Sequence, residues 1–71
     1  MTDTKKLKAA MILADVTAKV LGEAEGWSAP TTYRKINNLC DWTAPEIIIC
    51  KELLELNSEQ AEDIFFNKVI N

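Results

Sequence analysis

The chain has 71 residues, of which 48% are hydrophobic and 27% charged, with a formal net charge of −3. This length predicts one domain over residues 1–71, and no apolar run approaches the roughly 18 residues that span a bilayer. The start of the chain lacks a cleavage-type site, so we expect no signal peptide and a cytoplasmic protein. Two cysteines without any histidine give neither a metal-ligand cluster nor the commonest catalytic base. We therefore expect no cofactor, no enzymatic activity and no small-molecule substrate.

Charge and cysteines are unevenly spread. Residues 1–38 carry six Lys or Arg against four carboxylates, whereas residues 39–71 carry two against seven. An anionic ligand is therefore expected to meet the mildly basic front half. Cys50 lies in an apolar segment and is expected to be a buried, reduced thiol. A Cys40–Cys50 disulfide and a reactive thiol are the alternatives.

Helix signals recur along the chain, and no stretch alternates apolar and polar residues as a strand does. We expect an all-α fold, a compact five-helix domain, with helices near residues 4–14, 17–25, 28–37, 43–56 and 58–68. Each start is marked by a side chain able to accept a backbone hydrogen bond from the first turn. These N-cap candidates are Asp3 or Thr4, Thr17, Ser28, Thr43, and Asn57 or Ser58.

The start of the fourth helix carries the clearest local signal. Thr43 and Glu46 have the spacing of a capping box, and Trp42 and Ile47 that of a hydrophobic staple. Gln60 is placed for a second capping box in the last helix. The apolar residues of the fourth helix cover more than one face, so this helix is expected to be central or to contact a second chain.

The pattern of apolar residues predicts which side chains face the core. Those expected to be buried include Ile36, Ile47, Leu53 and Phe65, with Val20, Leu21 and Ala24 on the second helix. On the third helix, Tyr33 is expected to face inward with Ile36, whereas Thr31, Arg34 and Lys35 face outward. The last helix carries two apolar stripes, formed by Ala61, Ile64 and Phe65 and by Phe66, Val69 and Ile70. Its acidic first turns are expected to be a solvated helix start, with a partner-binding patch as the alternative.

Residues 17–37, TAKVLGEAEGWSAPTTYRKIN, combine two capped helices with a glycine turn. Gly22 lets another helix approach closely, and Gly26, four residues later, permits a tight turn. This order, followed by DWTAPEI and IFFN, resembles the helix-turn-helix of the phage Cro and repressor family over about residues 5–67. The resemblance implies a small phage-encoded regulator in which a five-helix, lambda-repressor-like DNA-binding domain makes up the whole protein.

The resemblance assigns residues 28–37 to the recognition helix. It implies that Ser28, Ala29, Thr31 and Arg34 face the DNA groove, and that Thr17, Lys19, Lys35, Asn37 and Asn38 lie near phosphates. Tyr33 is expected either to pack inward or to reach a phosphate. Arg34 alone can make a strong bidentate contact to guanine. The chain departs from the family pattern where Glu25 and Thr32 replace apolar residues, and where Ala29 and Pro30 replace polar or basic ones.

Two functions fit this pattern. The first is a Cro-like transcription regulator that binds operator DNA as a homodimer through residues 28–37, with the dimer contact on the last two helices. The alternative is an antirepressor or modulator that grips a cognate phage repressor protein through the same face, with Trp27, Thr31, Tyr33 and Arg34 in the contact. In that case the carboxylates Glu23 and Glu25 are expected to attract a basic partner.

Overall fold

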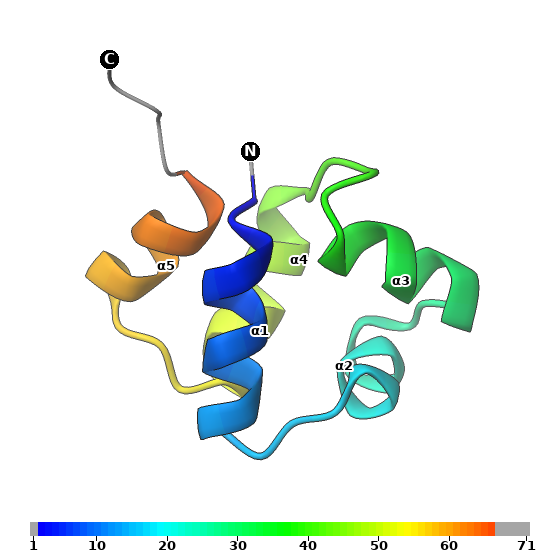
Figure 1. The fold of residues 1–71 in the computed structure, drawn as a ribbon, viewed down its shortest axis with the longest axis horizontal. Helices are drawn as coiled ribbons and strands as arrows, with labels where there is room; N and C mark the ends of the chain where they lie inside the picture. Colours follow the sequence, from blue (N-terminus) through cyan, green and yellow to red (C-terminus); the bar gives the residue numbers. More distant parts are fainter. Residues whose placement is uncertain (1, 67–71) are drawn as a thin grey trace.

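Five helices account for most of the chain in the computed structural model, which describes residues 2–66. They are α1 (Thr4–Leu13), α2 (Ala18–Glu25), α3 (Ala29–Ile36), α4 (Ala44–Leu53) and α5 (Ser58–Phe65) (Figure 1). Residues 2–66 contain no strand, which confirms the all-α prediction. The expected extension of the last helix to residue 68, and the stripe positions Val69 and Ile70, lie outside the described residues.

The N-terminal ends of all five helices are capped as predicted. In each case a side chain before the first helical residue accepts a hydrogen bond from the backbone N–H three positions on. The caps are Asp3, Thr17, Ser28, Thr43 and Asn57. Both predicted capping boxes form, with Glu46 and Gln60 returning a bond to the backbone of the cap residue.

The C-terminal ends were harder to predict. Gly26 closes α2 in the left-handed conformation, with φ of 77°, as its sequence position indicated. By contrast, α4 ends at Leu53, three residues earlier than expected. Glu55 takes a left-handed φ of 54°, and the Leu56 N–H turns back to the Lys51 carbonyl at 2.9 Å. Two further non-glycine residues make the same kind of stop after α1 and α3, namely Asp15 and Asn38.

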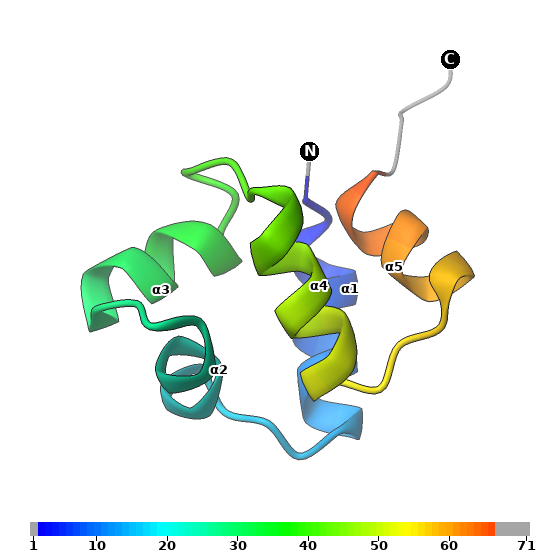
Figure 2. The same ribbon diagram turned by 180° about the vertical axis from the view of Figure 1, so that it is seen from behind.

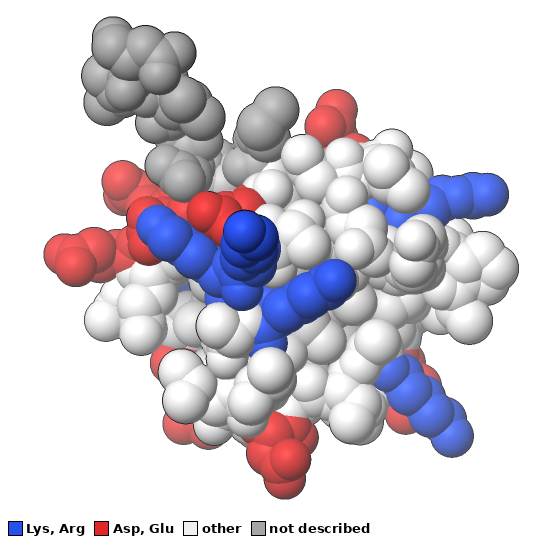
Figure 3. Space-filling model, viewed as in Figure 1, with Lys and Arg blue, Asp and Glu red and all other residues white. Residues whose placement is uncertain are grey.

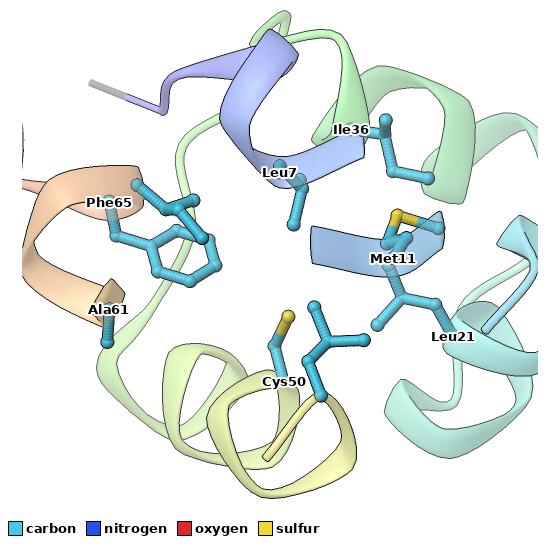
Figure 4. Packing of buried hydrophobic residues seen from close by; sticks show 9 residues of the cluster. Leu7, Met11, Leu21, Ile36, Cys50, Ala61 and Phe65 are labelled. Carbon is cyan, nitrogen blue, oxygen red and sulfur yellow. The ribbon is translucent and has the colours of Figure 1, made fainter. Parts of the chain in front are cut away.

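The core lies between α1 and α4. Helix α1 packs against α3 and α5, while α4 packs against α2 and α5. Figure 1 shows α1 in front of α4, and Figure 2 shows the reverse side with α4 in front. Side chains from all five helices converge between them (Figure 4). The buried set is Leu7, Met11, Leu21, Ile36, Cys50, Leu54, Ala61, Ile64 and Phe65.

Several burial predictions need correction. Ile36 and Phe65 are buried as expected, but Ile47 and Leu53 are only half-buried at the margin of the core. On α2, Leu21 is buried, whereas Val20 and Ala24 are exposed. The reason is the orientation of α2, which turns Leu21 and Gly22 inward.

Gly22 marks the close crossing of α2 and α3 that its position predicted. A methyl group on Gly22 would collide with the Oγ1 atom of Thr32, which is itself buried in α3. The Thr32 hydroxyl donates to the Ser28 carbonyl at 2.9 Å, so its polar atom is satisfied inside the contact. Thr32 stands where the family pattern has a larger apolar residue. The smaller threonine accompanies a crossing that is too tight for a side chain at position 22 of α2.

Gly22→Ala should lower the free energy of unfolding by about 1–3 kcal/mol, the usual cost of overpacking, despite alanine's better helix propensity. The measurement is a thermal melt followed by circular dichroism. In a Thr32→Ala background the colliding Oγ1 atom is gone, so the same change at position 22 should become neutral or stabilising. An equal loss in both backgrounds would contradict the close crossing.

Candidate functional site

A groove of about 850 Å³ runs between α1, α2 and α3. It is lined by the α2 side that carries Ala18 and Gly22 and by the α3 side that carries Thr32 and Ile36. Five of the residues singled out from the sequence also line it, namely Lys19, Trp27, Ala29, Tyr33 and Asn37. The structure therefore brings five of the eleven predicted site residues together in one groove, and we call the groove with the adjoining exposed surface of α3, which carries Arg34, the α2–α3 face.

Tyr33 is 64% exposed, so the expectation that it packs inward is wrong. Its helix instead buries Thr32, Lys35 and Ile36, which turns position 33 toward the groove and leaves it clear of the core. Arg34, next along α3, is also exposed, as predicted. The phenol and the guanidinium are thus both available on the outer side of α3.

Positive side chains surround this face. Lys8 of α1 lines the groove and donates from Nζ to Asn37 Oδ1 at 3.2 Å. Sequence reasoning missed Lys8 because only tertiary packing brings α1 beside the end of α3. Figure 3 shows positive side chains over α1, α2 and α3 around an uncharged area, while negative ones lie over α5 and also along the upper and lower edges of the molecule. The carboxylate of Glu23 also lines the groove, opposite in charge to Lys8 and Lys19.

Several predicted site residues also hold the local structure together. Thr17 and Ser28 are N-caps, and the Ser28 hydroxyl donates to Thr31 Oγ1 at 3.0 Å. The two asparagines that follow α3 act in the same way. The Asn37 amide donates to the Tyr33 carbonyl at 2.9 Å, and Asn38 Oδ1 accepts from the Thr2 N–H at 3.2 Å. These bonds fix the ends of α2 and α3 and orient their outer surface.

Lys35 faces inward, so the expectation that it faces outward is wrong. The residue is only 9% exposed, and its Nζ donates to Glu46 Oε1 at 2.9 Å and to the Asp41 carbonyl at 2.5 Å. The ammonium also lies 5.5 Å from the centre of the Trp27 ring, within cation–π range. A buried lysine requires such partners, and Glu46 supplies the negative charge.

Glu46 is the centre of a polar cluster behind the α2–α3 face. Its carboxylate accepts from the Thr43 N–H at 2.8 Å, from Lys35 at 2.9 Å and from Trp27 Nε1 at 3.0 Å. Burial alone would raise the pKa of Glu46. The hydrogen bonds from Thr43, Lys35 and Trp27, with the positive charge of Lys35, hold that pKa below its ordinary value. One carboxylate therefore ties the turn after α2, the end of α3 and the start of α4 together.

The two tryptophans are part of this cluster. The Trp27 ring stands edge-on to Trp42, with centroids 5.0 Å apart, and Trp42 in turn lies 4.7 Å from Phe65 of the core. The Trp42 indole N–H donates to the Lys35 carbonyl at 2.9 Å. Trp27, which was expected to contact a ligand, is half-buried and chiefly anchors the turn between α2 and α3.

Glu25 has no hydrogen-bond partner for either carboxylate oxygen, and both oxygens are buried. Burial, followed by the nearby charge of Glu46 and partly offset by Lys35, raises the pKa of Glu25 to about 7. The expectation that this carboxylate acts on a ligand beside the turn is therefore wrong, because its oxygens are not accessible.

Both cysteines are free thiols, and Cys50 is fully buried. The described residues contain no cluster of side chains able to hold a metal ion, and none of the described helices is long and apolar enough to cross a membrane. Comparisons with protein-family models, with curated proteins and with solved structures find no match for this chain.

Proposed function

We propose that this protein is a phage-type transcription regulator that binds operator DNA through the α2–α3 face, with α3 in the major groove. The supporting observation is the geometry of α2 and α3, which cross closely at Gly22, leave Arg34 and Tyr33 exposed on α3, and place Tyr33 in a groove that Lys8 and Lys19 also line. The acidic residues of α5 lie away from this face (Figure 3), so the net negative charge does not oppose a local approach to phosphate.

In this proposal the residues divide into two groups. Arg34 reads a guanine edge, with Ser28, Ala29 and Thr31 closer to the start of the recognition helix. Contacts to the phosphates come from Thr17, Lys19, Tyr33, Asn37 and Asn38, to which the groove geometry adds Lys8. Lys35 acts indirectly, because its ammonium is occupied by Glu46 and Asp41 behind the face.

The proposal includes a homodimer, which presents two copies of α3 to successive major grooves about 34 Å apart. Phe66 is 56% exposed and lies with Ile48 on a shallow apolar surface between α4 and α5. Lys51 and Glu62 line the same surface, so a twofold contact there brings charges of both signs to the partner copy. Such a regulator acts in the cytoplasm of the bacterial host.

The proposal is tested by selecting binding sites from random duplexes and measuring affinity by fluorescence anisotropy. Arg34→Ala should cost about 1–3 kcal/mol on the selected site and relax the preference for one base. Lys19→Ala should weaken binding to all duplexes alike and reduce the salt slope by about one. Lys6→Ala is the matched control, because the Lys6 ammonium pairs with Asp63 of α5 at 2.7 Å and does not line the groove, and it should leave the affinity for either duplex unchanged. Equal effects of all three changes would contradict the assignment of the face.

A second candidate is an antirepressor that uses the same face to bind a phage repressor. The observation that favours it is the apolar floor of the groove, formed by Ala18, Gly22 and Ile36, which suits a partner's apolar side chain better than a phosphate. In this case gel filtration with the repressor should give a complex that Tyr33→Ala weakens. Duplex binding should be absent at low salt.

A further inference from the structure

We infer that Glu25 is a proton-controlled latch between α2 and α4: its neutral carboxyl is accommodated within the contact, and loss of the proton loosens that contact. Glu25 is the last residue of α2, immediately before the left-handed turn at Gly26. Both of its carboxylate oxygens are buried without a hydrogen-bond partner. A neutral carboxyl tolerates such a position far better than a charged one, because ionisation there forfeits hydration.

The groups that face Glu25 do not compensate a negative charge. From α4, Glu46 adds a like charge and Cys50 contributes a buried neutral thiol. Among the described residues, Lys35 of α3 is the cation that acts on Glu25, and its ammonium already donates to Glu46 and to the Asp41 carbonyl. An ionised Glu25 therefore gains most by reaching water, and because its buried oxygens lie where α2 packs against α4, we expect ionisation to loosen the end of α2 from α4.

The direction of the pH dependence follows from the pKa. Glu25 has a pKa of about 7 in the folded protein against an ordinary value of 4.5. A carboxyl whose pKa is raised by folding contributes stability below its unfolded pKa, and that contribution is lost as the pH rises through the folded value. The latch is thus closed in acid, opens progressively between pH 4.5 and about 7, and is fully weakened above that.

Cys50 reports the state of this contact. Its thiol is fully buried in α4, and burial followed by the charge of Glu25 raises its pKa to about 12. Separation of α2 from α4 exposes the sulfur to a reagent. Because Cys40 is only half-buried, Cys40→Ser removes its competing signal.

The test compares Cys40→Ser with Cys40→Ser,Glu25→Gln, using 4,4′-dithiodipyridine, which reacts with thiols in acid as well as at neutral pH. The result is the Cys50 labelling rate of Cys40→Ser divided by that of Cys40→Ser,Glu25→Gln. This ratio cancels the reagent's own pH dependence. We expect the ratio to rise by at least about tenfold between pH 5 and pH 7.5 and to level off above. A ratio that stays constant with pH would overturn the latch.

A direct titration of Glu25 does not depend on whether the Glu25→Gln variant folds. The side-chain carboxyl of Glu25 in the unmodified protein can be followed by ¹³C NMR. A midpoint above pH 6 supports the latch, and a midpoint near the ordinary value of 4.5 overturns it. Neither experiment involves DNA, so their outcome is independent of the proposed function.

Discussion

Glu46→Ala should lower the free energy of unfolding by about 3 kcal/mol, near the lower end of the range for breaking a buried ion pair. The change removes the acceptor of three hydrogen bonds and leaves the Lys35 ammonium buried without its counter-charge. The lower end applies because the Glu46 and Lys35 side chains remain 20% and 11% exposed. Chemical denaturation followed by tryptophan fluorescence measures the loss.

Two matched variants separate the parts of this effect. Thr43→Ala removes the N-cap hydroxyl alone and should cost about 1 kcal/mol. Lys35→Met removes the buried cation, so adding Glu46→Ala to it should cost much less than Glu46→Ala costs by itself. If the two changes prove additive, the ion pair does not join α3 to α4 as the distances indicate.

The contributions of Glu46 and Glu25 to the stability of the fold should change with pH in opposite directions. The pKa of Glu46 is held below its ordinary value, so the stability it contributes is present above its unfolded pKa of 4.5 and is lost as the pH falls through the folded value. The contribution of Glu25 is lost as the pH rises. The two neighbouring carboxyls therefore narrow the pH range of greatest stability, Glu46 from the acid side and Glu25 from the alkaline side.

Trp42→Ala should lower the free energy of unfolding by about 3–5 kcal/mol, the range for truncating a large aromatic side chain that packs against the core. Trp42 links Trp27 at the turn to Phe65 in the core, at centroid distances of 5.0 and 4.7 Å. For a domain of this size, such a loss approaches the whole free energy of folding. We expect near-ultraviolet circular dichroism to show loss of fixed tertiary packing at 25 °C.

Trp42→Phe is the control, because it keeps a ring but removes the N–H that donates to the Lys35 carbonyl. It should cost about 0.5–1.5 kcal/mol, the net value of one hydrogen bond, because the Lys35 carbonyl still accepts from the Asn38 N–H at 3.3 Å. A Trp42→Ala protein that melts like the original would show that the aromatic row does not support the turn.

The sequence predicted well whatever depends on near neighbours along the chain. The caps at Thr43 and Asn57 and the turn at Gly26 each rest on interactions within one helical turn, so their residue types are enough to reveal them. The ends of α1, α3 and α4 were less visible. They use Asp15, Asn38 and Glu55 in a left-handed conformation for which glycine is the usual signal.

The burial of polar residues could not be predicted from the sequence, for a different reason. A hydrophobic pattern on α3 favours burying Tyr33 and exposing Lys35, yet the structure does the reverse. Lys35 is buried because Glu46, eleven positions away, meets it across two helices. Glu46 had been interpreted only as part of a capping box, which it also is. No local pattern reveals a side chain that serves a cap and a distant ion pair together.

Binding of DNA to the α2–α3 face can be measured by ¹H–¹⁵N NMR with a random-sequence 20-base-pair duplex at low salt. We expect chemical-shift changes in the backbone amides around Lys19, Ser28 and Arg34 and beside Lys8, and we expect added salt to reverse these changes. No changes of comparable size are expected around Lys51. An absence of shifts, or shifts centred on the α4–α5 surface, would contradict the proposal.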